Sequence, residues 1–169
     1  QYSKVSSAVS RLVELFRSLE EPPQASVQGL WSELFLIAHA CDTRVAAEAW
    51  HAEPRALHDF SLGEHRVEVK STTSSRRIHE FLLDQLVSPL GTEVVVVSFI
   101  LEESLSGLSI RDLWQNINSN GTLSTELCQR LLRVISLSLG RDWRDARRIA
   151  FDPDLALKQV RFYDTSAVP

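Results

Sequence analysis

Apolar residues recur at helical spacing over the first forty positions of the chain. In residues 3–19 they are three or four positions apart, with charged and hydroxyl side chains between them, which predicts an amphipathic helix. Pro22 and Pro23 follow, and proline cannot continue a helix. A second helix is expected from Ser26, a suitable N-cap, to about Ala40. Its apolar residues cover most of its circumference, which indicates burial.

The period of the apolar positions changes to two in residues 57–70. Residues 57–62 and residues 65–70 both alternate, and Gly63-Glu64 between them fits a turn, so a β-hairpin is expected. For residues 43–50 the pattern leaves two alternatives, an extension of the second helix or a strand.

A run of β-branched residues at positions 93–101 gives the strongest strand signal in the chain. Such a run is typical of a central strand that is buried on both faces. Helices are expected at residues 108–116 and 124–139, and shorter strands at residues 78–83 and 160–163. Helices around a central sheet give an α/β (α+β) fold.

The composition is that of an ordinary folded domain. The 169 residues are 44% hydrophobic and 24% charged, which is enough for one domain with a buried core. No apolar run approaches the roughly 18 residues needed to cross a bilayer, so we expect no membrane partner and a cytoplasmic location. Cys41 and Cys128 are far apart in the sequence, and we expect both to be free thiols.

Net charge limits the kind of nucleic-acid surface that the chain can present. A formal charge of −4 argues against a uniformly basic coat, although it allows a local basic cluster. Of the 18 basic residues only Lys4, Lys70 and Lys158 are lysines. A lysine at a particular position is therefore a rarer choice here than an arginine.

Asp59, Glu68 and Lys70 form the pattern that carries chemistry. On the second strand of the predicted hairpin, Glu68 and Lys70 point to one face and Val67 and Val69 to the other. Phosphodiester hydrolysis needs charge neutralisation, a nucleophilic water and a stabilised leaving oxygen, and Mg²⁺ held by carboxylates provides all three. Mg²⁺ takes one or two protein carboxylates and keeps several waters. Lys70 can reach the same water. For Glu68 and Lys70 the alternative is a solvated strand face with ordinary cross-strand charges. For Asp59 it is a polar residue near a hairpin turn.

These residues resemble those of the PD-(D/E)xK nucleases, the superfamily of restriction endonucleases and resolvases. Asp59 is followed after eight residues by Glu68-Val69-Lys70, and an expected helix that bears Glu33 precedes them in the sequence. His58 stands where the superfamily motif has proline. A bacterial family of PD-(D/E)xK-motif proteins is similar to the chain in six segments, two of which include the motif residues. The segments are Gly29 to Leu34, Asp59-Phe60, Glu68 to Thr72, Arg76 to His79, Asp84 to Leu86 and Arg161 to Tyr163.

The resemblance implies a restriction-endonuclease-like mixed central sheet flanked by helices. It also implies a Mg²⁺-dependent endonuclease acting on DNA, with Mn²⁺ as a substitute cation. Asp59, Glu68 and the carbonyl of Val69 would hold the metal, Lys70 would assist the water and Glu33 would complete the site. For Glu33 the alternative is a narrow wet stripe on its helix.

Further residues near the motif are candidates for substrate binding. Arg76, Arg77 and His79 follow the motif strand closely, so they could contact the phosphates that flank a cleaved bond, and His79 could aid proton transfer. The alternative is an exposed loop with solvated charges. By resemblance, Gln85 belongs to the outer wall of the site, and the alternative is an ordinary loop amide. The remaining histidines, at positions 39, 51, 58 and 65, lack the tight spacing of a zinc site.

The chain is expected to be a fragment of a longer protein, because it begins at Gln1 and contains no methionine. We divide it into an N-terminal helix with its proline linker (residues 1–24) and a nuclease-like core (residues 25–169). The resemblance implies DNA and the subunits of a restriction or phage-defence system as partners, and a homodimer is a further expectation. Two alternatives to an active nuclease stay open: a catalytically weak DNA-binding or scaffold subunit, and a structural interaction domain.

Overall fold

A mixed four-stranded sheet lies at the centre of the protein. The computed structural model describes residues 25–51, 56–86 and 92–165, and residues 7, 9, 10, 12–14, 16, 17, 19, 20, 22 and 23 before them. The strands are β1 (Phe60–Leu62), β2 (His65–Thr72), β3 (Glu93–Ile100) and β6 (Arg161–Asp164), in the order β1-β2-β3-β6. β1 and β2 form an antiparallel hairpin, β2 and β3 are parallel, and β6 is antiparallel to β3.

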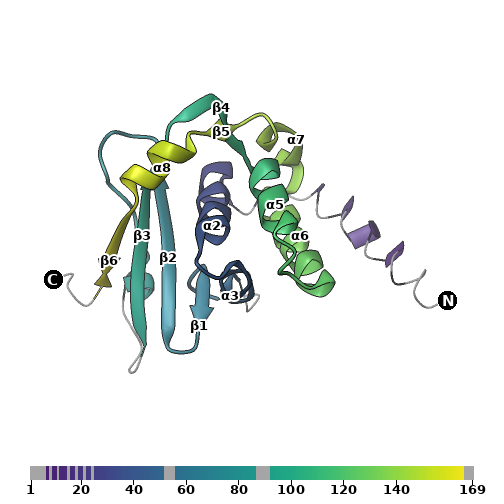
Figure 1. The fold of residues 1–169 in the computed structure, drawn as a ribbon, viewed down its shortest axis with the longest axis horizontal. Helices are drawn as coiled ribbons and strands as arrows, with labels where there is room; N and C mark the ends of the chain where they lie inside the picture. The colour runs from purple at the N-terminus through teal and green to yellow at the C-terminus, as the bar shows by residue number, and fades with distance from the viewer. Residues whose placement is uncertain are drawn as a thin grey trace.

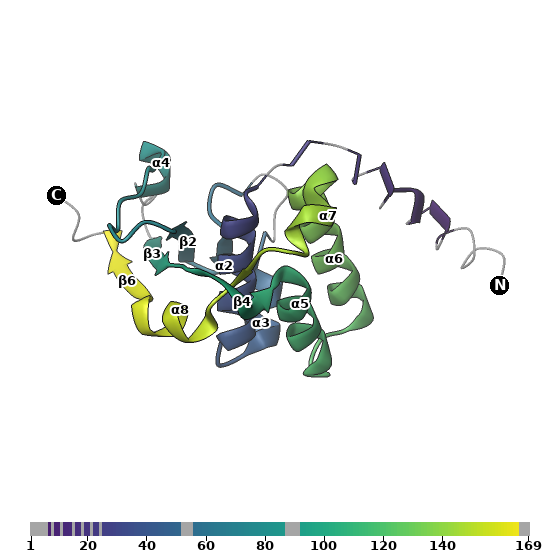
Figure 2. The ribbon, with the colours of Figure 1, turned by 90° about the horizontal axis from the view of Figure 1, so that it is seen from above.

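Helices cover the sheet and extend the molecule away from it (Figure 1). They are α2 (Val27–His39), α3 (Thr43–Ala49), α4 (Leu83–Leu86), α5 (Ile110–Ser119), α6 (Thr125–Leu139), α7 (Trp143–Ala146) and α8 (Pro153–Gln159), with a 3-10 turn, η1, at Gly140–Asp142. β4 (Glu103–Ser109) and β5 (Ala150–Phe151) pair in a second small sheet. Seen from above, α2 lies between the sheet and the layer of α5 and α6, while α4 projects on the side opposite α8 (Figure 2).

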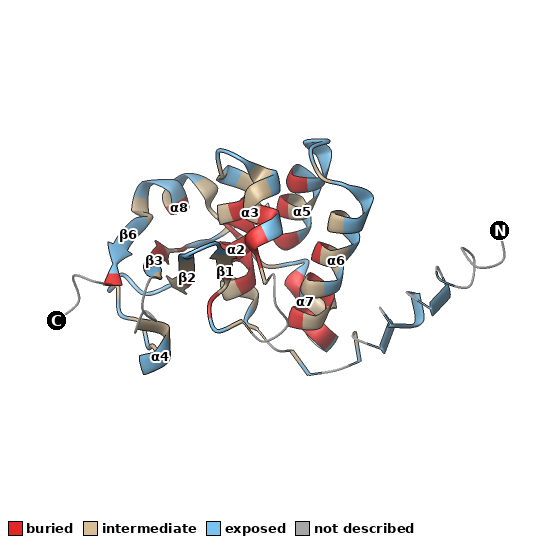
Figure 3. Cartoon of the chain, turned by 90° about the horizontal axis from the view of Figure 1, so that it is seen from below, coloured by how far each residue is buried: buried red, intermediate tan, exposed pale blue. Residues whose placement is uncertain are grey.

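The core is built around α2, whose apolar residues leave few polar positions. Leu30, Trp31, Leu34 and Phe35 are all at most 1% exposed. Trp31 stacks on Phe35 with ring centroids 4.6 Å apart, and its indole N–H donates to the carbonyl of Leu108. Buried positions gather in α2 and on parts of α5, α6 and α7, whereas the described residues from 7 to 17 are exposed (Figure 3). The polar side chains in the middle of α2, Ser32 and Glu33, are therefore buried.

Most of the expected elements are present, and the predicted α/β fold is confirmed. The β-branched run forms β3, which is central between β2 and β6. α5 begins with a capping box at Ser109, and α6 begins after the N-cap Ser124. Residues 43–50, for which the pattern left two alternatives, form the helix α3 up to Ala49. The expected N-terminal helix is helical at each described position from Ser7 to Arg17.

Two strand predictions need correction. Residues 78–83 form no strand, since both edges of β3 are taken by β2 and β6, and this segment leads into α4 instead. The first hairpin strand is predicted over residues 57–62, but β1 begins only at Phe60 and ends at Leu62. At this point the N–H of Val69 donates to the side chain of Asp59, 2.7 Å away, instead of to a main-chain carbonyl of β1.

Several apolar side chains are exposed to solvent on the surface. Val9, Leu12 and Phe16 on the N-terminal helix are each more than half exposed. Cys41 and Cys128 are free thiols, as expected. None of the helices in the described part of the chain has the length and apolar character needed to cross a membrane.

Candidate metal centre

Glu33 is the carboxylate that α2 buries. It is 8% exposed, and its Oε2 accepts two hydrogen bonds. One comes from the indole Nε1 of Trp50 at 2.7 Å, and the other joins it to Nε2 of His51 at 3.0 Å. Both donors lie at the C-terminal end of α3. A helix that is apolar nearly all round thus directs its one acid toward this turn.

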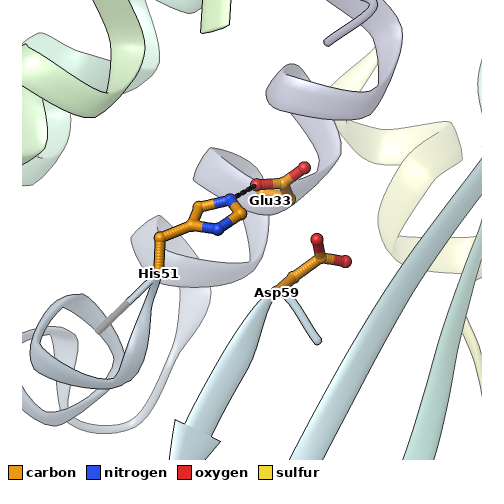
Figure 4. Close-up of side chains that lie close together, drawn as sticks. All are labelled: Glu33, His51 and Asp59. Carbon is orange, nitrogen blue, oxygen red and sulfur yellow. Dashed lines mark hydrogen bonds and ion pairs between the residues drawn. The ribbon is translucent and has the colours of Figure 1, made fainter. Parts of the chain in front are cut away.

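Asp59 meets Glu33 and His51 from the sheet side. It directly precedes β1, and its carbonyl accepts the N–H of His51 at 2.9 Å. Glu33, His51 and Asp59 each offer a ligand atom, and these atoms all lie within 4.8 Å of one another. The three side chains point toward one another from α2, from the end of α3 and from the start of β1 (Figure 4). They form a cluster of the kind that can hold a metal ion.

Glu68 and Lys70 lie in contact on one face of β2, as the alternating pattern predicts. Lys70 Nζ is 2.9 Å from Glu68 Oε1, and that oxygen also accepts from Nε2 of Gln85 at 2.5 Å. Glu68 is only 3% exposed. Its other oxygen, Oε2, is the one buried side-chain nitrogen or oxygen of the described residues that has no hydrogen-bond partner. An unpartnered buried carboxylate oxygen is costly unless a cation reaches it.

The site is short of positive charge. Burial, followed by the charges of Glu33 and Glu68, raises the pKa of Asp59 to about 8. Burial also raises the pKa of Glu68, against the opposing effect of Lys70. For His51, burial opposes the charged ring, but the hydrogen bond and charge of Glu33 dominate and raise its pKa. Carboxylate oxygens with no sufficient counter-charge suit a divalent cation, so these residues fit the metal that the motif implies.

Gln85, expected at the outer wall of the site, contacts both Glu68 and Lys70 through its side chain. Its side chain donates to Glu68, and its Oε1 accepts from Lys70 Nζ at 3.3 Å and from the N–H of Leu82. Its carbonyl oxygen lies 3.1 Å from Nε2 of His58. Through this residue, the short helix α4 is tied to the acid and the lysine of β2.

Arg77 and His79 converge on Ser98, the residue of β3 that pairs with Lys70. The guanidinium of Arg77 donates to the carbonyl and hydroxyl of Ser98 and to the carbonyl of Gln159, and Nε2 of His79 lies 2.6 Å from the same hydroxyl. Burial, then the charges of Arg77 and Lys70, lower the pKa of His79. The Arg76 side chain, by contrast, is exposed. The substrate-binding roles of these residues stay predictions.

His51 is the member of the cluster that sequence reasoning passed over. It lies 18 residues from Glu33, so no short spacing links it to the acids. Its backbone has a φ of 41°, in the left-handed region that side chains other than glycine rarely adopt. Arg130 of α6 donates to the carbonyls of Ala47, Glu48, Trp50 and His51 and so fixes this turn. No local sequence pattern signals either role.

Comparison with known proteins supports the same reading. A model of the family described as "Putative PD-(D/E)XK family member, (DUF4420)" matches residues 1–164. The chain belongs to this family. The expected resemblance is thus confirmed, and the mixed sheet with flanking helices agrees with a restriction-endonuclease-like fold. No protein with a curated description and no solved structure matches the chain. Membership in a PD-(D/E)XK family points to metal-dependent nuclease chemistry.

The metal-free protein should lose stability as the pH rises from about 4 to about 8. Asp59 keeps its proton in the folded state up to a pKa of about 8, whereas its ordinary value is 3.8. The stability that the protonated Asp59 contributes to the folded state is therefore complete below pH 4 and is lost as the pH rises through 8. The melting temperature in a chelator should fall by several degrees over this window, at roughly 3 °C per kcal/mol. Asp59→Asn should weaken the dependence, and Asp84→Asn, at an exposed carboxylate, should not. An equal slope in all three proteins would contradict the assignment.

Arg130→Met should destabilise the fold by about 2 kcal/mol, because several carbonyls at the end of α3 lose a charged donor. Arg133→Met is the matched control, since Arg133 lies on the same helix and is exposed. Urea unfolding followed by circular dichroism measures both. Equal stabilities of the two variants would show that Arg130 does not hold the turn.

Proposed function

We propose that this chain is a metal-dependent endonuclease that hydrolyses phosphodiester bonds in DNA, with Mg²⁺ as its cation and Mn²⁺ as a substitute. The observation that carries the proposal is the unpartnered Oε2 of Glu68, buried on the strand face that also bears Lys70. A purely structural charged pair would leave no acceptor without a donor. Family membership supports the same chemistry.

The residues of the centre have different roles in the proposed hydrolysis. Asp59, Glu68 and the carbonyl of Val69 would hold the cation. A bound divalent cation supplies charge neutralisation at the phosphate and an activated water. Lys70 is held between Glu68 and Gln85, so its ammonium group is oriented before any substrate arrives. In that position it can orient the attacking water or stabilise charge on the phosphate as the bond breaks.

The polymer is proposed to be DNA, in a restriction or phage-defence system that works in the cytoplasm. Arg76 is exposed in the loop after β2 and can reach a phosphate. Arg77 is occupied by three acceptors, and it supports this loop by joining it to β3 and to the end of α8. The loop that bears Arg76 is thus joined to β3, the neighbour of β2 in the sheet.

A second candidate function is a DNA-binding or scaffold subunit of a defence complex with little activity of its own. The net charge of −4 favours it, because DNA affinity comes largely from basic residues that neutralise phosphates. In that case partner subunits would provide most of the phosphate contacts. Binding of DNA without cleavage in Mg²⁺ or Mn²⁺ would select this candidate.

Lys70→Met should slow cleavage by at least about 100-fold, because the positioned ammonium group is lost. The assay is nicking of supercoiled plasmid by purified protein in Mg²⁺. Lys158→Met is the matched control, since Lys158 is an exposed lysine of α8. If Lys70→Met cuts the plasmid as fast as the wild type does, the proposed nuclease site is wrong.

Substitutions of the two adjacent arginines Arg76 and Arg77 should have different effects, the first on DNA affinity and the second on stability. Arg76→Gln should weaken DNA binding to a similar extent for all sequences and lower the slope of log affinity against log salt by about 1. Arg77→Gln should lower the melting temperature instead, because Ser98 and Gln159 lose their donor. Fluorescence anisotropy at several salt concentrations and thermal melts test the pair. If Arg77→Gln weakens DNA binding and Arg76→Gln lowers the melting temperature, Arg77 and not Arg76 contacts the phosphate.

A further inference from the structure

We infer that two copies of this chain form a dimer by exchanging their N-terminal helices, each of which docks in a groove between α5, α6 and α7 of the other copy. The groove belongs to the helical layer that α2 separates from the sheet (Figure 2). None of the residues that line it belongs to the candidate metal centre. The inference is therefore independent of the proposed function.

The groove is a large apolar hollow on the surface of the helical layer. Its volume is about 350 Å³, whereas a water molecule takes about 30 Å³ in the liquid. Leu139 of α6 lines it together with the half-buried indoles of Trp114 and Trp143, and Arg111 and Arg147 are exposed lining residues. Tryptophan and arginine are among the residue types that contribute most of the binding free energy in protein interfaces. The lining is thus that of a docking surface for an apolar partner.

The N-terminal helix offers the matching surface. Its side chains Val9, Leu12, Val13 and Phe16 are between 44% and 63% exposed. They are spaced i, i+3, i+4 and i+7, so they form one face of the helix. Amphipathic helices dock in apolar grooves through anchors at this spacing. Docking would remove the four side chains and the groove from water at the same time, which is favourable.

The joint between this helix and the core favours exchange between copies over docking in the same copy. The N–H of Ala25 donates to the carbonyl of Ser138 at 3.1 Å, so the chain leaves the core beside Leu139, at the edge of the groove. Pro22 and Pro23 come just before this point, and proline fixes φ and stiffens a linker. The N-terminal segment leads away from α6 and α7 (Figure 1, Figure 2). Short, stiff hinges of this kind promote the exchange of an element between identical copies.

The area of the contact sets the expected affinity. A helix that spans residues 7–17 is roughly 16 Å long and 10 Å wide, so one of its faces covers roughly 250 Å². Reciprocal exchange buries two such faces and two grooves, which is roughly 1,000 Å² in all. This area reaches the lower limit for a specific interface, so we expect a dissociation constant on the order of 10 µM.

Analytical ultracentrifugation of the full chain tests the dimer. Leu12→Ser combined with Phe16→Ser should weaken dimerisation at least about 10-fold, because two exposed anchors are lost while the core is unchanged. Leu105→Ser combined with Leu157→Ser is the matched control, since both leucines are exposed on other elements. The control pair should keep the dissociation constant of the wild type. A wild type that is monomeric at roughly 200 µM, or a helix variant that dimerises as well as the control, would overturn the inference.

Photo-crosslinking identifies the surface that the helix contacts, and it needs no substitution inside the groove. A benzoyl-phenylalanine in place of Phe16 is placed in a mixture of isotope-labelled and unlabelled chains. We expect crosslinks between chains of different label, located by mass spectrometry in peptides that contain Trp114, Leu139 or Trp143. Crosslinks confined to single chains would show docking in the same copy. Crosslinks to other parts of the second copy would assign the helix another surface, and either result would refute the exchange.

Discussion

The gathering of two buried carboxylates, Glu33 and Glu68, with the half-buried Asp59 is the constraint on which the rest of this structure depends. Glu33, Asp59 and Glu68 belong to three separate elements, and none of these acids can leave water without compensation. The indole of Trp50, the N–H of Val69, the amine of Lys70 and the amide of Gln85 each compensate one of them. One fully buried oxygen, Oε2 of Glu68, stays without a partner. The protein has therefore concentrated negative charge where its own donors are too few, which is how a cation-binding site differs from a structural ion-pair network.

The helical layer explains how this charge is held in place. α2 is buried between the sheet and α5 with α6, so Glu33 cannot turn outward to water. Arg130 reaches from α6 to the end of α3 and fixes the turn that presents Trp50 and His51. On the opposite side, Gln85 joins α4 to Glu68. Elements far from β2 in sequence thus determine where Glu68 and Lys70 lie, and a fold with the same strands but another helical layer would not make this site.

Sequence reasoning could predict what depends on local periodicity. The alternation in β2 places Glu68 beside Lys70, and the β-branched run identifies β3 as central, because both signals lie within a few residues. The role of His51 could not be predicted in this way, since it depends on a contact across 18 residues and on a left-handed backbone. The anchoring of Arg77 at Ser98 and Gln159 likewise needs the position of β3 and α8. What escaped prediction is the set of long-range contacts that a single sequence does not encode locally.

The two oxygens of Glu68 show why its neighbour must be a lysine two residues away. Oε1 accepts from Lys70 and Gln85, while Oε2 is buried and has no donor. A cation at Oε2 would leave the contact between Oε1 and Lys70 unbroken, so metal and ammonium group could be present together on one carboxylate. An arginine at this position would place a broad, planar group with five donors beside the acid, and its fork would compete for both oxygens. In a chain with 18 basic residues and only three lysines, the compact ammonium group at position 70 contacts Oε1 and leaves Oε2 without a donor.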